Sequence, residues 1–418
     1  MDVSSNMEPT ASAPQPNSSE NRSDRGAQHR NRIVRIWTLA LGLVIITVLG
    51  VGHQFGWGKV VGVDALCPFG GLETLWALIV SATFLQRVAA SSVILLATVV
   101  AIAVVFRRSF CGYICPFGAL QELFARAGSL VWGNRRPQMP TMLDRPARYL
   151  KYVLLVGFVV WSWQAAELVL RPYDPWVAWM HLGAPDLKTV VAEFAVGFVV
   201  LGVSVVGSFV YDRFFCKYLC PMGALLAIVS KFSIFKIRRD TTTCTNCKAC
   251  DKACPVNVSV STVETVDSPE CIDCSECVNV CPVKGTLTVT GPKNKSGQRV
   301  TLGTMAVLGS VLAIIGVALA LTTATGTFAW TLPSLAAITP GGAATPSSFD
   351  VANIRGSMSF EEVSKATGIP GEVFRQKFGV TEAQMVKPMK EFAESKGFDV
   401  ETDVRGFVAE QLGQTTAP

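Results

Sequence analysis

The sequence predicts an all-α polytopic membrane protein with a small cysteine-rich α+β module inserted into it and a small helical domain at the C-terminus. Three observations predict this fold class. Of the 418 residues, 50% are hydrophobic and only 16% are charged, whereas soluble domains average about 25% charged residues. The apolar residues are gathered in long runs. Finally, eight of the 13 cysteines lie within one short segment.

The long apolar runs set the predicted number of membrane spans. A spanning helix needs roughly 17–25 mostly apolar residues, and we expect about five spans: 34–52, 91–106 (extendable to 88–110), 149–167, 190–211 and 301–322. A further run, 75–85, is too short to cross and is expected to be re-entrant or interfacial. The remaining boundaries follow from composition: a disordered tail (1–32), a membrane domain (33–239), the inserted module (240–290), the fifth span (300–322), a linker (323–348) and the C-terminal domain (349–418).

Basic residues predict the orientation. Segments 1–35, 107–151 and 212–299 hold 25 Lys and Arg residues, whereas the two loops on the other side hold four. Cytoplasmic loops carry the excess of Lys and Arg. We therefore expect a multi-pass protein of the cytoplasmic (inner) membrane, with the N-terminus and inserted module cytoplasmic and the C-terminal domain extracytoplasmic. Because the excess charge of +6 is explained by membrane orientation, no nucleic-acid partner is expected; the partners are membrane lipid and redox molecules.

The inserted module carries two identical cysteine runs. Each reads Cys-x2-Cys-x2-Cys-x3-Cys-Pro, starting at Cys244 and at Cys271. This spacing is typical of bacterial-type 2[4Fe–4S] ferredoxins, in which the fourth cysteine of each run ligates the other cluster. The alternatives are two zinc sites or a scaffold of reduced thiols, and two full copies with the proline argue against both. The predicted iron ligands are Cys244, Cys247, Cys250 and Cys281 for one cluster, and Cys271, Cys274, Cys277 and Cys254 for the other.

A second motif is duplicated outside this module. Phe-Cys-x-Tyr-x-Cys-Pro-x-Gly-Ala-Leu occurs at 110–120 and 215–225, each time just after a basic residue that follows a span. Both copies are expected at the cytoplasmic membrane surface, with the two cysteines of each copy on one face of a helical turn. Two interpretations stay open: a further metal or iron–sulfur centre, or cysteines that pack as small apolar residues. The four cysteines concerned are Cys111, Cys115, Cys216 and Cys220.

A partial third copy begins at Cys67, in the sequence Cys67-Pro-Phe-Gly-Gly. The predicted topology places it on the outer side. This cysteine could ligate a centre, react as a thiol or simply pack.

These motifs resemble a known family. The duplicated Phe-Cys-x3-Cys-Pro after paired spans, followed by a two-cluster ferredoxin module, resembles NapH-type membrane iron–sulfur proteins and the C-terminal half of NosR-type proteins, over residues 34–287. The resemblance implies electron transfer between the quinone pool, or a cytoplasmic donor, and an extracytoplasmic reductase. The chain would then be an electron-transfer subunit, as in a quinol dehydrogenase component, with no catalytic acid, base or nucleophile. The alternative is a redox-sensing or maturation accessory protein for a respiratory metalloenzyme.

The chain departs from the resemblance in three ways. It lacks the extracytoplasmic flavin-binding domain of NosR-type proteins, it adds the Cys67 motif, and it has a fifth span and a C-terminal domain. A quinone site on the outer side would need polar groups near the headgroup level, and an ionisable residue within a span is a candidate by default. The candidates are His53, Arg171, Asp174, His181 and Glu193. Their alternative roles are structural, or, for His53 with His181, haem ligation.

The C-terminal domain is predicted to hold four helices, at 360–367, 371–378, 382–396 and 402–412. Ser359-x-x-Glu362 and Thr381-x-x-Gln384 are capping boxes, which start helices. The stretch 360–380 also resembles a helix-turn-helix, but a DNA-binding role would require a basic, cytoplasmic domain, and this one is acidic and predicted outside. A docking or packing module for an extracytoplasmic partner is the expected role.

Overall fold

The structure is a computed structural model that describes residues 18–54, 67–81, 90–133, 139–165, 169–184, 187–294, 296–328, 351, 354, 356, 358–387, 389 and 392–412. The chain divides into two compact units, 1–328 and 329–418, which are described separately here.

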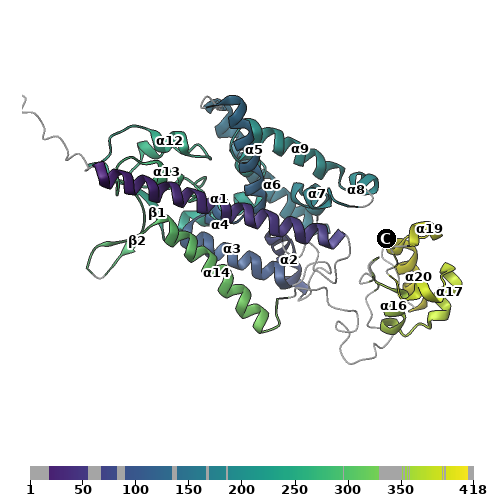
Figure 1. Ribbon diagram of the computed structural model, residues 1–418. Helices are drawn as coiled ribbons and strands as arrows, with labels where there is room; N and C mark the ends of the chain where they lie inside the picture. The colour runs from purple at the N-terminus through teal and green to yellow at the C-terminus, as the bar shows by residue number, and fades with distance from the viewer. Residues whose placement is uncertain are drawn as a thin grey trace, which may run out of the picture. The chain divides into compact units, whose positions relative to one another are not determined.

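The first unit is a bundle of helices with a small sheet at one end (Figure 1). Its longer helices carry most of the apolar sequence, and they are α1 (Ser18–Gln54), α2 (Pro68–Ser81), α3 (Ala90–Phe106), α5 (Pro116–Trp132), α6 (Thr141–Ala165), α9 (Ala195–Val210), α11 (Pro221–Val229) and α14 (Thr304–Ala324). Short helices join them: α4 (Ser109–Tyr113), η2 (Arg171–Tyr173), α7 (Pro175–His181), α8 (Leu187–Glu193), α10 (Phe214–Tyr218) and η3 (Ser230–Phe232). The predicted helical architecture is therefore observed.

Two of the described helices are long and apolar enough to cross a bilayer, Gly26–Gly52 and Thr304–Ala324. Ser91–Phe106, Ala195–Val210 and Pro221–Phe232 are shorter apolar helices. Two expectations need correction. Residues 18–32 were expected to be disordered but belong to α1. The segment 190–211 was expected to be one helix, but it is divided between α8 and α9 at Phe194, whose ring stacks on His181.

The predicted short segment 75–85 also changes its bounds. The described helix α2 starts at Pro68, directly after Cys67, and reaches Ser81. It packs along α3, and Gly71 makes this possible because a Cβ there would lie 2.4 Å from the carbonyl oxygen of Ser92.

The cysteine-rich module forms the end of the bundle where α1 begins (Figure 1). Its three-stranded antiparallel sheet has the order β1-β2-β3, from Lys236–Arg239, Leu287–Lys293 and Arg299–Leu302. The register pairs Ile237 with Val289, and Val289 with Leu302. Two short helices, α12 (Ala249–Ala253) and α13 (Glu276–Val280), and the turn η4 (Val260–Thr262) complete it.

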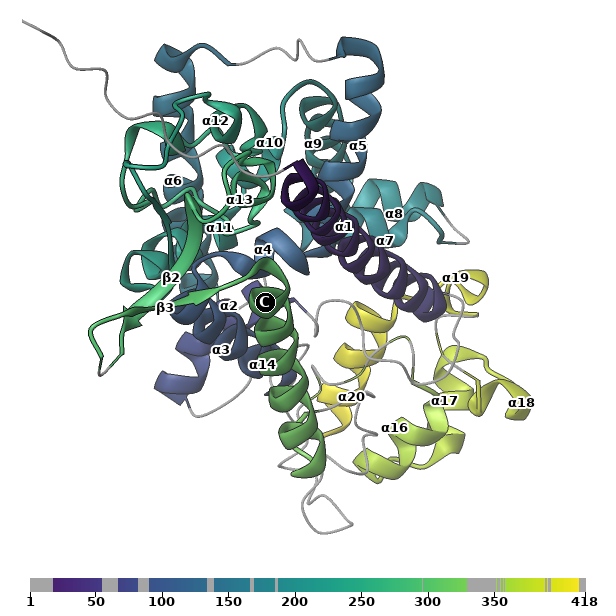
Figure 2. The ribbon, with the colours of Figure 1, turned by 60° about the vertical axis from the view of Figure 1, so that its left-hand side comes forward.

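A continuous apolar core joins the module to the helices. Ile102 and Phe106 of α3 and Val307 of α14 share one buried cluster with Ile272 and Val289 of the module. Figure 2 shows that α14 starts at the end of the sheet and runs beside α3. The module is therefore anchored to the bundle by packing as well as by the chain itself.

The second unit contains α16 (Phe360–Thr367), α17 (Gly371–Phe378), α18 (Glu382–Met385), α19 (Ala393–Lys396), η7 (Val400–Val404) and α20 (Arg405–Gln411). Both predicted capping boxes are formed, and Gly368 and Gly379 end helices in the left-handed conformation, which costs glycine little. The predicted helix 382–396 is instead two short helices. Phenylalanine rings around Phe360 form the core.

Candidate iron–sulfur sites

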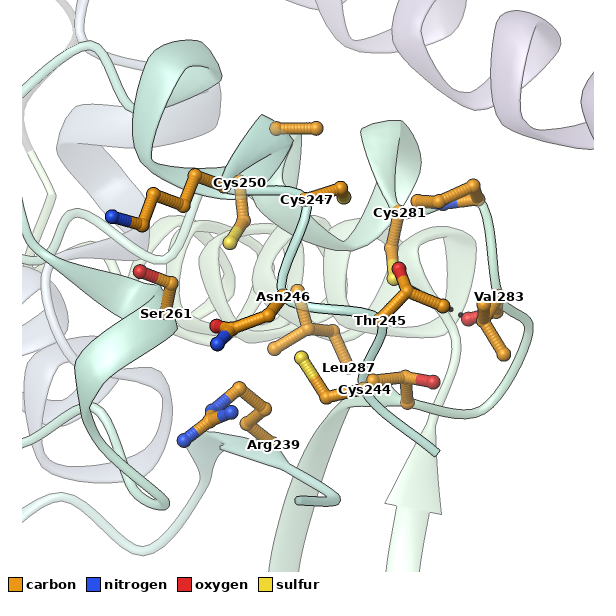
Figure 3. A pocket seen from close by; sticks show the side chains of 14 residues that line it. Arg239, Cys244, Thr245, Asn246, Cys247, Cys250, Ser261, Cys281, Val283 and Leu287 are labelled. Carbon is orange, nitrogen blue, oxygen red and sulfur yellow. Dashed lines mark hydrogen bonds between the residues drawn. The ribbon is translucent and has the colours of Figure 1, made fainter. Parts of the chain in front are cut away.

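Four cysteines of the module line one pocket (Figure 3). The cavity measures about 360 Å³ including its open mouth, and the cysteines are Cys244, Cys247, Cys250 and Cys281. A hydrogen bond from Arg239 lowers the pKa of the Cys244 thiol, which favours the thiolate that metal binding requires. The pocket therefore brings together one of the two cysteine sets that the sequence predicted as ligands.

The second set is buried deeper. Cys271, Cys274 and Cys277 are buried, and Cys254 is close enough to interact electrostatically with all three. The backbone N–H of Val258 donates to the Cys254 sulfur at 3.4 Å. Each fourth cysteine thus lies with the three cysteines of the other run.

The two runs have the same backbone geometry. Asn246 and Lys248 have left-handed φ values of 56° and 56°, and Asp273 and Ser275 take the equivalent positions with 48° and 57°. Alternating conformations of this kind turn successive backbone N–H groups toward one side of a loop, where they bind anions. Cysteine runs with this shape fit an anionic cluster.

The duplicated motif forms a third group of four cysteines. Cys111 lies in α4 and Cys216 in α10, while Cys115 and Cys220 are the N-caps of α5 and α11. The Cys115 sulfur accepts a hydrogen bond from Gly118 N at 3.4 Å, and the Cys220 sulfur accepts one from Gly223 N at 3.2 Å. The backbone N–H groups of Cys115 and Cys220 still bond to the carbonyl oxygens of Phe110 and Phe215 at 2.9 Å, and the proline after each second cysteine starts a new helix. The four thiols nevertheless interact with one another.

Two buried arginines cross between the copies. The arginine three residues before the first cysteine of each motif reaches the glycine of the other: a Cβ on Gly118 would lie 2.2 Å from Arg213 Nη1, and one on Gly223 would lie 2.8 Å from Arg108 Nη2. Arg213 also donates to the Cys111 carbonyl oxygen at 2.7 Å. The copies are thus interlocked about an approximate two-fold axis.

The two copies differ in what holds their arginines. Arg213 pairs with Glu122 of α5 at 2.9 Å, and Arg35 of α1 pairs with the same carboxylate at 2.7 Å. Burial opposes ionisation of Glu122, but Arg35 and Arg213 overcome it and hold its pKa well below the usual range. Arg108 instead faces Glu270 of the module at 3.5 Å, and Lys151 of α6 contacts this glutamate at 2.5 Å.

Gln121 breaks the symmetry at the thiols themselves. Its Oε1 accepts from the Cys216 backbone N–H at 3.3 Å, which directs its Nε2 to the Cys216 sulfur at 3.0 Å. The equivalent residue of the second copy is Leu226, which is fully buried and apolar. One of the four sulfurs therefore accepts a hydrogen bond from a side-chain amide that its counterpart lacks.

Contacts with α1 give the position of this group along that helix. Arg35 donates to the Gly112 carbonyl oxygen at 3.0 Å, and a Cβ on Gly42 would lie 3.2 Å from the Ile114 carbonyl oxygen. A helix rises 1.5 Å per residue, so the residue before Cys115 lies about 10 Å farther along α1 than Arg35. From here α5 runs back toward Arg35, which pairs with Glu122. The expected position at the membrane surface stays a prediction.

The buried cysteines of the module touch the first copy of the motif. A Cβ on Gly112 would lie 2.5 Å from the Ile272 carbonyl oxygen and 3.3 Å from Cys274 Cα. On either side of this contact, Ser109 donates to Asp273 at 3.0 Å and Tyr113 bonds to Ser275 at 3.0 Å. Cys274 therefore lies against the backbone that joins Cys111 to Cys115.

The residues present fit iron–sulfur clusters at these sites. The buried atoms Arg108 Nε and Arg213 Nε have no hydrogen-bond partner within the described structure, and buried donors are ordinarily paired. An anionic group between the thiols would supply that partner. Among the described residues, no three metal-binding side chains converge on a single ion.

Cys67 has different neighbours from the other thiols. It packs with Phe69, Leu155 and Ala224, and its charged neighbours are Asp174 and Glu73. Its sulfur accepts from the backbone N–H groups of Gly70 and Phe69, just as the cysteines that cap α5 and α11 accept from theirs. Cys67 is thus a third cysteine at the start of a helix.

Of the predicted quinone residues, three have described side chains, and their grouping into one site stays a prediction. Asp174 caps α7 by accepting from Trp176 N at 2.9 Å, whereas His181 ends the same helix and bonds to the Val177 carbonyl oxygen at 2.8 Å. Glu193 ends α8 and is exposed. The side chains of His53 and Arg171 lie outside the described residues.

Sequence reasoning missed the residues that surround the paired motif. Gln121, Glu122 and Glu270 were not singled out. The arginines before each motif were noted only as basic residues, although their repeated position, three residues before the first cysteine, was a usable signal.

Comparison with known proteins agrees with these sites. The family model described as a 4Fe-4S binding domain matches residues 88–140 and 194–240, and each match contains one copy of the paired motif. The model described as a 4Fe-4S dicluster domain matches residues 236–289. No solved structure matches the chain.

Curated relatives point the same way. YccM of Escherichia coli (strain K12), which bears the name of an electron transport protein, is 32% identical over 274 residues, covering 62% of this chain and 73% of YccM. Protein NirI of Paracoccus denitrificans (strain Pd 1222) is 36% identical over 39% of this chain and 24% of NirI. The ferredoxin-type protein NapH of Escherichia coli (strain K12) is 28% identical over 36% of this chain and 48% of NapH. The chain therefore belongs to the NapH/NosR-like family of iron–sulfur electron-transport proteins.

Proposed function

We propose that the chain passes electrons through a bilayer by way of three [4Fe–4S] clusters. When bound, such clusters accept and release single electrons at potentials set by their surroundings. The ligand sets are Cys244, Cys247, Cys250 and Cys281; Cys271, Cys274, Cys277 and Cys254; and Cys111, Cys115, Cys216 and Cys220.

One contact carries this proposal. Cys274 lies against Gly112, between two cysteines of the paired motif, with no side chain in the gap. This contact supports a second and a third ligand set that lie side by side. Contacts with α1 support a row of three sets: Gln28 donates to the Cys281 carbonyl oxygen of the first set, which opens to solvent, Arg35 pairs with Glu276 of the module, and Gly42 lies against Ile114 of the paired motif.

The protein's side chains would hold and tune the third cluster. Arg108 and Arg213 supply buried positive charge beside the thiolates, which lowers the cost of burying an anion. Gln121 donates to the Cys216 sulfur, and hydrogen bonds to sulfur are one way in which a protein sets cluster potential. Phe117 and Phe215 pack next to the thiols, which excludes water.

We further propose five crossings, by α1, α3, α6, the broken pair α8–α9, and α14. In this arrangement the N-terminus and the module are cytoplasmic and the second unit is extracytoplasmic. The distribution of Lys and Arg supports this orientation. The electron partners would be the quinone pool or a cytoplasmic donor on one side and an extracytoplasmic reductase on the other.

The third cluster is tested by counting iron. The double variant Cys111→Ala/Cys216→Ala, purified without oxygen, should lose about four irons and four sulfides per chain relative to the natural protein, because a cubane cannot be held by the remaining two thiols. Electron paramagnetic resonance of the reduced protein should lose the signal of one cluster. Cys67→Ala, at a cysteine that belongs to neither copy of the paired motif, is the matched control and should retain the full iron content.

An equal iron count of about eight in the natural protein and the double variant would show that the protein has no third cluster. Zinc in place of iron in either protein would overturn the proposal as a whole.

A further inference from the structure

A large cleft opens between the module and the helices. It measures about 1880 Å³ including its open mouth, and its walls come from α1, α5, the end of α9 and α12 with the loop that follows it. Residues on its walls include Arg35, Glu122, Arg126, Tyr211, Lys217 and Cys254. No residue of this cleft belongs to the outer-face quinone candidates that the sequence predicted.

One wall of the cleft gives direct access to a proposed cluster. Cys254 lines the cleft and also belongs to the buried set with Cys274 and Cys277. Lys217, which lines the cleft as well, interacts electrostatically with this cysteine. A molecule in the cleft would therefore touch a cluster ligand without crossing any protein.

An apolar track leads to the same cleft along α9. Val199, Val203 and Val206 are exposed, and Val210 lines the cleft. Their spacing of four, three and four residues puts all four on one face of the helix. The other side of α9 packs on α5 and α7, so the track faces outward, where lipid would lie if α9 is a span.

The charges of the cleft favour a neutral ligand over a phosphate. Five basic and four acidic side chains line it, and most of the charges nearest α1 are paired with each other: Arg35 and Arg126 with Glu122, and Arg32 with Glu276. Little net charge is left for an anion. Tyr211, Ser129 and Asn257 add uncharged polar groups, which suit carbonyl or hydroxyl oxygens.

We propose that this cleft is the quinone site of the protein, with the head of a lipid-soluble quinone beside Cys254 and its isoprenoid tail along the valine face of α9. This inference deepens the proposed function and rests on it. In the balanced reaction a quinol loses two electrons and two protons and becomes the quinone. Cys254 would help to hold the cluster that accepts the electrons one at a time, and the protons would leave to water through the polar mouth of the cleft. The reverse reaction uses the same groups.

The test is a substitution that blocks the cleft in the full-length protein. Ser129→Trp places a large ring in the cleft. Leu130→Trp is the matched control, because Leu130 is the next residue of α5 and is 87% exposed. Cluster reduction is followed optically with a short-chain quinol. Ser129→Trp should raise KM by about tenfold or more through lost binding, with iron content and resonance spectra unchanged, and Leu130→Trp should behave as the natural protein. A photoreactive azidoquinone should label residues 199–217.

The outcomes separate this inference from the proposed function. If quinol fails to reduce the clusters of the natural protein, the proposed electron exchange with quinone is wrong, and the proposed quinone site is wrong as well. If the natural protein reacts but Ser129→Trp reacts equally well and the label lies elsewhere, only the site is wrong. A bound anionic phospholipid that Ser129→Trp releases, without any change in KM, would make the cleft a headgroup site instead.

Discussion

At the scale of single residues, the paired motif depends on small and charged positions that cooperate. Each glycine after Cys-Pro leaves room for the arginine of the other copy, and no larger residue would fit without moving that arginine. Each arginine then brings its positive charge to thiols that are buried in an apolar surrounding. The motif is therefore one unit built from two copies, and neither copy is complete alone.

Gln121 provides a test of how this unit sets cluster potential. Gln121→Leu removes the donor to the Cys216 sulfur and keeps the side-chain volume. Donation to sulfur favours the more negative, reduced cluster, so its loss should lower the reduction potential of the third cluster on the order of tens of millivolts. Redox titration followed by paramagnetic resonance measures the shift.

The matched control is Leu123→Ala on the exposed face of the same helix, which should leave every potential unchanged. A potential in Gln121→Leu that equals that of the natural protein, with all clusters present, would show that this amide only fills space.

The sequence predicts individual cysteines better than it predicts their surroundings. Fixed spacing gathers the module cysteines because a short loop can reach only a few positions around one cluster. Gln121 and Glu270 could not be found in this way, since Gln121 contacts the second copy, 95 residues along the chain, and Glu270 reaches Arg108 from the module. Their contacts arise only when α5, α10 and the module pack together.

At the scale of elements, three helices begin in the same manner. The helices α2, α5 and α11 each start with proline directly after a cysteine, whose sulfur accepts from backbone N–H groups of the first turn. Two of the three bring their cysteines to a common site. The start of a helix carries partial positive charge, so this repeated element places thiols where a negative charge is stabilised.

The contact between α4 and the module can be tested by adding one methyl group. Gly112→Ala brings a Cβ against the Ile272 carbonyl oxygen, and the module must shift. Such overpacking typically costs about 1–3 kcal/mol, so the module should unfold at lower denaturant concentration and the second and third clusters should exchange electrons more slowly. Denaturant titration and freeze-quench resonance measure these two effects.

Gly157→Ala on α6 is the control, because a Cβ there meets nothing within 4 Å. Alanine is favoured over glycine in a helix interior by up to about 1 kcal/mol, so this variant should be unchanged or slightly more stable. Equal stability of the two variants would mean that Gly112 is not the point of close contact.

Elements were predicted well where a local signal marks both ends. The helices α16 and α17 have the predicted bounds, since a capping box or proline starts each and a glycine ends each. The break at Phe194 was missed because the sequence is apolar on both sides of it; at the break, the Phe194 ring stacks on His181. The direction of α5, which runs back toward Arg35 of α1, was missed for a related reason: apolar length does not say which way a helix runs.

At the scale of the whole molecule, the proposed ligand sets follow one another along α1, from Gln28 beside Cys281 to Gly42 beside Ile114. The cleft beside Cys254 meets this row at its centre. A lipid-soluble carrier could thus exchange electrons with the middle of the row while a soluble protein uses the open end. This arrangement explains why the module is packed into the helices by a shared core rather than tethered by a loop.

The orientation of the row depends on how many times the chain crosses the bilayer, and α14 offers a direct test. Alkaline phosphatase needs the disulfides that form only in oxidising compartments, so it reports the side on which it is placed. Fusions after residue 294 and after residue 328 differ mainly by β3 and the 21-residue helix α14, which is long enough to cross. The fusion after residue 328 should therefore be roughly tenfold or more as active as the fusion after residue 294.

A fusion after residue 133, which Lys and Arg flank, gives the inactive reference, and a fusion after residue 54, which follows α1, gives the active reference. High activity after residue 294 would put the module outside and reverse the row of clusters, and equal low activity at both positions would leave the second unit in the cytoplasm.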